Sequence, residues 1–180
     1  MARSAKLTAR VFFALVPPPA LRAALVGMAT SVAARAHGRP VPADNLHVTL
    51  AFIGAWPASN LSRWIDAGAR CAGESMHVTL DRLGGFRGVG VAWIGARTTP
   101  VALEQLAGAL GAELTAAGVP VDARAFAPHI TLARRCRGPF PDEAAGPYEW
   151  TIDALVLMRS HTERTGARYV EVARWPLRVV

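Results

Sequence analysis

Several kinds of residue are scarce in this chain of 180 residues, and each scarcity excludes a class of protein. There are two cysteines, Cys71 and Cys136, in unrelated contexts, which predicts neither a disulfide framework nor a CxxC metal site. Charged residues make up only 18% of the chain and apolar residues 52%, which excludes a disordered tail and a coiled coil. No apolar run is long enough to span a bilayer, and residues 11–16 are too short for a signal peptide. We expect a reduced cytoplasmic protein that folds as a single domain over residues 1–180.

Lysine is almost absent, since Lys6 is the single one and the other basic residues are arginines. The 20 Lys+Arg residues outnumber the 13 Asp+Glu residues and give a formal net charge of +7. A basic, arginine-rich surface attracts phosphates and polynucleotides through its long-range field and through bidentate hydrogen bonds. Genomic base composition also enriches arginine and alanine, so the charge permits a nucleic-acid partner without requiring one.

A pattern of strand, proline, amphipathic helix, loop and His-x-Thr-Leu strand occurs twice along the chain. The interval from Pro17 to His47 is 30 residues, and the interval from Pro100 to His129 is 29 residues. Such a repeat predicts two lobes related by a pseudo-twofold axis, with repeat halves at approximately 8–89 and 90–180. The apolar runs predict strands at residues 10–16, 46–53, 76–83, 90–96, 129–133, 152–158 and 167–173.

Three helices are expected between these strands. Leu21, Leu25, Met28 and Val32 form one apolar stripe, and residues 60–71 form a second helix. Leucines at 103, 106, 110 and 114 form the third stripe, and the glycine-rich segment 83–88 is expected to be a loop. The predicted fold is α+β and bilobal, with two mainly antiparallel sheets, outer helices and a central active-site cleft.

The two His-x-Thr-Leu strands carry the candidate chemistry. Residues i and i+2 of a strand share a face, so His47 projects beside Thr49, and His129 projects beside Thr131. An imidazole beside a hydroxyl suits an oxyanion such as phosphate. Two histidines that face each other across a cleft can act as general base and general acid in one displacement, and this chemistry needs no metal.

Other interpretations of these motifs exist. A lone histidine on a strand is more often structural, but the repetition of the motif at equivalent places favours a site. Zinc is a poor fit, because two histidines without a carboxylate or thiolate nearby make an incomplete ligand set. A third HxTL begins at His77, but it lacks the preceding strand, proline and helix, so we expect a surface or inter-strand histidine there.

The sequence resembles the 2H phosphoesterase superfamily, and within it the bacterial RNA 2′,3′-cyclic phosphodiesterases, once described as 2′-5′ RNA ligases. The resemblance rests on these stretches, which follow the family's order over nearly the whole chain: RVFFALVPP, GRPVPADNLHVTLAFIG, VAWIGAR, FAPHITLARR and RYVEVARWPL. It implies hydrolysis of terminal 2′,3′-cyclic phosphates of RNA to 2′-phosphates, with reversible 2′-5′ joining of RNA ends as an associated reaction. His47, Thr49, His129 and Thr131 match the two family motifs.

The resemblance leads to a mechanistic hypothesis in which His129 deprotonates water and His47 protonates O3′, although the near-symmetry of the motifs also allows the reverse assignment. Thr49 and Thr131 would hold the non-bridging oxygens. Arg134 is a candidate phosphate or base contact, with a solvated surface role as the alternative. Phe13 is a candidate for stacking on a base, although core packing is its more ordinary role.

Two other functions stay open at this point. One is a phosphodiesterase that acts on a small cyclic phosphate metabolite, and the other is a non-catalytic module that binds RNA ends. The expected partners are RNA ends or 2′,3′-cyclic nucleotides. We expect no cofactor, no metal, no membrane association and no obligate protein partner, and a monomeric state.

Overall fold

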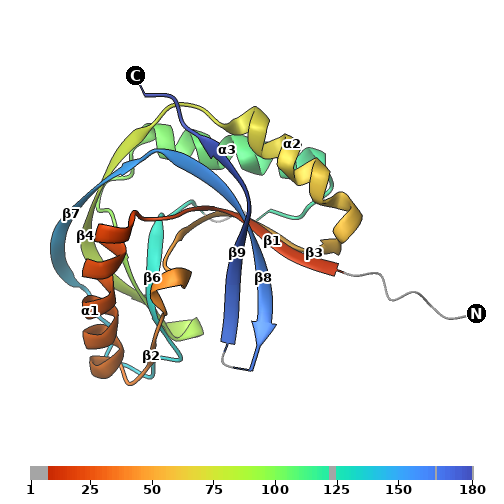
Figure 1. Ribbon diagram of the computed structural model, residues 1–180. Helices are drawn as coiled ribbons and strands as arrows, with labels where there is room; N and C mark the ends of the chain where they lie inside the picture. Colours follow the sequence, from red (N-terminus) through yellow and green to blue (C-terminus); the bar gives the residue numbers. More distant parts are fainter. Residues whose placement is uncertain (1–7, 122–124, 165, 180) are drawn as a thin grey trace, which may run out of the picture.

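The computed structural model describes residues 8–121, 125–164 and 166–179 (Figure 1). Three α-helices and a sheet account for most of this part of the chain. The helices are α1 (Pro19–Arg35), α2 (Leu61–Cys71) and α3 (Val101–Ala116). The strands are β1 (Thr8–Leu15), β2 (Arg39–Pro40), β3 (Val48–Pro57), β4 (Met76–Phe86), β5 (Val91–Gly95), β6 (His129–Arg134), β7 (Glu143–Ile152), β8 (Ala154–Glu163) and β9 (Gly166–Pro176).

The described strands form one nine-stranded antiparallel sheet in the order β7-β4-β5-β6-β3-β1-β8-β9, with β2 beside β6. The α+β prediction is confirmed. The two expected sheets are joined, but only by a single residue pair, Val48↔Ile130, between β3 and β6. The sheet is symmetric about the junction between β6 and β3. Moving outward from this junction, one side has β6, β5, β4 and β7, and the other has β3, β1, β8 and β9 in the corresponding places. The pseudo-twofold axis therefore passes between β3 and β6.

The two repeat halves of the sequence are interleaved in space. β4, from the first half, pairs with β5, and β8, from the second half, pairs with β1. The helices follow the same exchange, since α1 packs on β6 and β2, whereas α3 packs on β3. Each side of the sheet thus depends on both halves of the chain (Figure 1).

The helices form where prolines and leucines predict them. Pro19 opens α1, where its missing N–H breaks no helical hydrogen bond, and Pro100 is the N-cap of α3. One face of α1 and one face of α3 are buried in the core. Met28 of α1 is partly buried and packs against the same core. The buried residues are Leu21, Leu25, Ala29, Val32 and Ala33 of α1, and Leu103, Leu106, Ala107, Leu110 and Leu114 of α3. No described helix combines the length and the apolar character needed to cross a membrane.

The prediction of a loop at residues 83–88 is wrong for residues 83–86. β4 continues to Phe86, and Gly84 and Gly85 pair with Trp93 and Ala92 of β5. These glycines are required because aromatic rings occupy the space that side chains would take. A Cβ at Gly84 would collide with the Trp93 ring. Glycine here serves close packing in a strand rather than a loop, and the strand delivers Phe86 to the site described next.

Candidate active site

His47 and His129 lie at the junction between the two sides of the sheet. His47 directly precedes β3, and His129 is the first residue of β6. The residue after each histidine forms the pair Val48↔Ile130 that joins the two strands. Directly opposite residues of an antiparallel pair share a face, and their neighbours share the other. The two His-x-Thr pairs therefore project from one face of the sheet, side by side across the pseudo-twofold axis.

Backbone hydrogen bonds determine the tautomer of both imidazoles. Nδ1 of His47 lies 2.7 Å from the carbonyl oxygen of Asn45, and Nδ1 of His129 lies 2.8 Å from that of Ala127. A carbonyl oxygen only accepts, so each Nδ1 must carry the proton that it donates. In the neutral ring Nε2 is then unprotonated, and it is the atom available for acid-base chemistry. The equivalent bonds, each two residues upstream, repeat the pseudo-symmetry at the level of single atoms.

The threonines are arranged less symmetrically than the histidines. Oγ1 of Thr49 lies 3.0 Å from Nε2 of His47, so its hydroxyl donates to the neutral ring. No such bond joins Thr131 to His129 within the described residues. Trp93, which pairs with Thr131 across β5 and β6, has a buried Nε1–H without a partner among these residues. The His129 side thus has a polar donor that remains unsatisfied.

The histidines are held in their neutral form. The pKa of His47 is lowered from 6.5 to about 4. Burial is the largest cause, the bond to Asn45 opposes it, and the charges of Arg134 and His129 add to the lowering. Burial also lowers the pKa of His129, against the bond to Ala127, and Arg134 adds to the lowering. The lowered pKa values favour neutral rings at pH 7, which makes Nε2 a proton acceptor in each.

A β-bulge turns Arg134 toward the histidines. Across β5 and β6 the register shifts between Trp93↔Thr131 and Ala92↔Ala133, so one extra residue lies in β6. Without it, Arg134 would lie on the opposite face from His129, five positions away. Its influence on the pKa of both histidines shows that its charge is close to the pair.

A second β-bulge lies in β3. The register of β1 and β3 shifts between Ala14↔Thr49 and Phe13↔Ala51, which brings Phe52 to the face of His47. Phe52 follows His47 by five residues, as Arg134 follows His129, so the two are equivalent in the repeat. One side of the site therefore has a cation where the other has an aromatic ring, and Phe52 is 67% exposed.

Aromatic rings flank each histidine. Phe12 and Tyr169 lie with their centroids 5.0 and 5.2 Å from the ring of His47. Phe86 and Trp93 lie 4.9 and 6.0 Å from the ring of His129. These walls remove water from the imidazoles, which accounts for the lowered pKa of both.

The assignment of Phe13 to the site is wrong. Its side chain is fully buried, and its ring lies 6.2 Å from that of Trp175 in the core. Its neighbour Phe12 is the residue that reaches His47. Both faces of β1 are covered, so apolar character alone could not distinguish them. The pairing of β1 with β3 distinguishes them, because Ala14 lies opposite Thr49 and Phe12 shares the face of Ala14.

His77 lies elsewhere, as expected for a motif outside the repeat. It belongs to β4, which is separated from β6 by β5. Nε2 of His77 lies 2.6 Å from Oε2 of Glu149 on β7, and the hydroxyl of Thr79 donates to the same carboxylate at 2.9 Å. These side chains are exposed, and they form a surface network between two strands. Among the described residues, no group of three or more His, Cys, Asp or Glu could hold a metal ion.

Known proteins resemble the chain over nearly its full length. A sequence profile of the 2′-5′ RNA ligase superfamily matches residues 17–164. The RNA 2′,3′-cyclic phosphodiesterase of Escherichia coli (strain K12) is 32% identical over 170 residues, covering 93% of this chain and 96% of that protein. The RNA 2′,3′-cyclic phosphodiesterase of Thermus thermophilus is 32% identical over 181 residues, covering 94% and 90%. The crystal structure of E. coli LigT complexed with 3′-AMP superposes with a TM-score of 0.88 at 31% identity, covering 95% and 99%.

Proposed function

The chain belongs to the 2′-5′ RNA ligase superfamily, and from that premise we propose that it hydrolyses the 2′,3′-cyclic phosphate at RNA ends to a 2′-phosphate. Two relatives that match most of this chain carry the name RNA 2′,3′-cyclic phosphodiesterase. The observation that carries the proposal is the pair of imidazoles, each with Nδ1 bound to a carbonyl and Nε2 available on the same face of the sheet.

The reaction needs one base and one acid on opposite sides of the phosphorus. Nε2 of His129 accepts a proton from water as the water oxygen bonds to phosphorus. The P–O3′ bond breaks, and Nε2–H of His47 donates a proton to O3′. The product is a 2′-phosphate and a 3′-hydroxyl. His129 is left protonated and His47 neutral, and proton exchange with solvent restores both. General acid and base catalysis of this kind contributes roughly 10²–10⁴-fold for each group.

The charged and hydroxyl groups around the pair suit the phosphate. Thr49 and Thr131 donate to its non-bridging oxygens, and Arg134 supplies a fixed positive charge. A bound phosphate brings negative charge next to His47, which opposes the lowering of its pKa by burial and by Arg134. Substrate binding therefore favours the protonated form of His47 that the acid role requires.

The same geometry accommodates the joining reaction after which the superfamily is named. If the 5′-hydroxyl of a second RNA replaces water, the same proton transfers give a 2′-5′ phosphodiester. Hydrolysis of a small cyclic phosphate metabolite would use the same atoms, and its test is a comparison of substrates. A module that only binds RNA ends would show no turnover.

Turnover of a 2′,3′-cyclic-ended oligoribonucleotide by single variants tests the proposal. We expect His47→Ala and His129→Ala each to lower kcat by about 10²–10⁴, and the double variant to be far less than additively worse, because the pair acts as a unit. His77→Ala is the matched control, since it removes the histidine of an identical HVTL sequence outside the site and should cost at most a few-fold. A folded single variant that keeps a tenth of the wild-type rate removes that histidine from the mechanism.

A further inference from the structure

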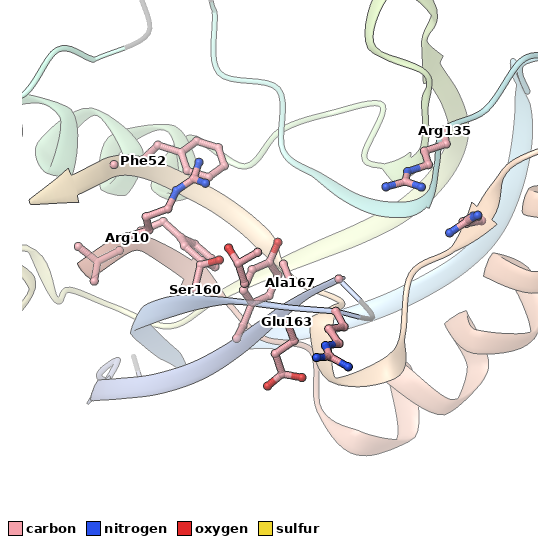
Figure 2. Close-up of a pocket in the computed structure, with 14 residues that line it drawn as sticks. Arg10, Phe52, Arg135, Ser160, Glu163 and Ala167 are labelled. Carbon is pink, nitrogen blue, oxygen red and sulfur yellow. The ribbon is translucent and has the colours of Figure 1, made fainter. Parts of the chain in front are cut away.

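A cavity of about 510 Å³ lies next to the His47 side of the site, and its walls are unusually rich in arginine (Figure 2). The arginines come from four separate segments of the chain. They are Arg10 of β1, Arg39 of β2, Arg135 after β6 and Arg164 at the end of β8. Its volume is within the range of roughly 300–1,000 Å³ that holds small-molecule-sized ligands. We call it the basic pocket.

The arginines of the basic pocket lack carboxylate partners. Within the described residues none of the four has a salt bridge, whereas Arg35 pairs with Glu143 and Arg70 with Glu113 on other surfaces. The pocket contains one carboxylate, that of Glu163, which lies 3.7 Å from Arg168. Four guanidinium groups around one pocket create a positive potential, and planar donors of this kind suit phosphate. Arginines without a carboxylate partner among the described residues are suited to bind an external anion.

The basic pocket is continuous with the catalytic pair. Phe12 and Tyr169 line the pocket, and they are also the two rings within about 5 Å of His47. Phe52 adds an exposed apolar surface between the arginines and Phe12, whose ring centroid lies 5.8 Å away. Cations beside exposed aromatic rings are the combination that binds single-stranded nucleic acid, because the backbone meets charge and the bases meet rings.

The backbone conformation of Arg135 also indicates a functional role for this side of the basic pocket. Its φ is +56°, in the left-handed region that residues other than glycine seldom adopt. This conformation lies immediately after Arg134, where the chain leaves β6. Strained backbone persists where the surrounding structure requires it, and it concentrates at functional sites.

We propose that the basic pocket binds the phosphodiester backbone of the nucleotides that precede the cyclic phosphate. This inference rests on the proposed function. The RNA chain extends from His47 past Phe12 and Tyr169 and toward the β8–β9 hairpin. The terminal ribose then lies on the His47 side of the phosphorus. Since attacking and leaving oxygens are in line in phosphoryl transfer, O3′ departs toward His47, which makes His47 the acid and His129 the base.

Two substrates with the same terminal nucleotide distinguish the contribution of the basic pocket from that of the catalytic pair. One is a 2′,3′-cyclic mononucleotide, and the other is a cyclic-ended oligoribonucleotide of five residues. The test variant combines Arg10→Gln with Arg135→Gly, because glycine accepts the left-handed backbone at Arg135 without strain. The control is Arg178→Gln, which removes the same kind of charge from an exposed position outside the pocket.

We expect the double variant to lower kcat/KM for the oligonucleotide at least tenfold and to leave that for the mononucleotide within twofold, with Tm unchanged or raised. The slope of log kcat/KM against log salt for the oligonucleotide should flatten by about 0.7 for each lost phosphate contact. Equal effects on both substrates, or an oligonucleotide rate equal to that of Arg178→Gln, would overturn the inference alone. Absence of turnover of both substrates by the wild type would overturn the proposed function and the inference with it.

Discussion

The low pKa of His47 makes the stability of the protein dependent on pH, and replacing this one side chain tests it. The folded state keeps the pKa at about 4, whereas the unfolded chain has the ordinary value of 6.5. The pKa is depressed by folding, so the contribution to stability is fully present above pH 6.5 and is lost as the pH falls toward 4. Linkage over this interval predicts that the free energy of unfolding falls by roughly 2–3 kcal/mol between pH 7.5 and pH 4.5 because of His47 alone.

Urea unfolding at the two pH values, for the wild type and for His47→Gln, measures this contribution. Other groups also titrate in this range, including Glu113 and Glu149, whose pKa values are lowered by their hydrogen bonds to Arg70 and His77. The difference between the two proteins cancels these shared terms. The wild type should lose roughly 2–3 kcal/mol more than His47→Gln, and His161→Gln controls for removal of an exposed imidazole. A difference below about 0.5 kcal/mol would refute the reasoning that burial holds this ring neutral.

Three further predictions concern the surroundings of the pair. Arg134→Gln removes a charge that lowers the pKa of both histidines, so the pH profile of kcat/KM should move to higher pH, and an unmoved profile would show that Arg134 is distant from them. Gly84→Ala should destabilise the protein by about 1–3 kcal/mol in thermal or urea unfolding, because the new methyl group overlaps the Trp93 ring; an unchanged stability would mean that the ring moves aside freely. Phe13→Ala should cost about 3–5 kcal/mol of unfolding free energy, and a loss below about 1 kcal/mol would contradict its place in the core.

Much of the fold and the chemical centre follow from local sequence patterns. The spacing of leucines and the position of prolines predict α1 and α3, because a helix buries residues three and four apart. Side chains alternate between the two faces of a strand, which predicts that His47 and Thr49 share a face, and the repeat predicts that the two motifs are equivalent. These are short-range rules, and they apply before the chain is folded.

The parts that sequence patterns miss depend on long-range pairing. The bulges in β3 and β6 bring Phe52 and Arg134 to the face of the histidines. The pairing of Ala14 with Thr49 places Phe12, and not Phe13, on that same face. Tyr169 reaches His47 from β9, far along the chain, because β8 and β9 pair beside β1. The basic pocket draws arginines from four segments that no local motif connects. Strand order and register decide all of these, and neither is visible in the periodicity of one segment.

Phosphorus NMR of a 2′,3′-cyclic nucleotide, incubated with the pure protein in EDTA, tests the central claim most directly. The spectrum reports which P–O bond breaks, because the 2′- and 3′-phosphate products give separate signals. The account predicts that the cyclic phosphate is converted to the 2′-phosphate alone, and that neither His47→Ala nor His129→Ala yields it at a comparable rate. A 3′-phosphate product, or a cyclic phosphate left intact by the wild type, would contradict the account.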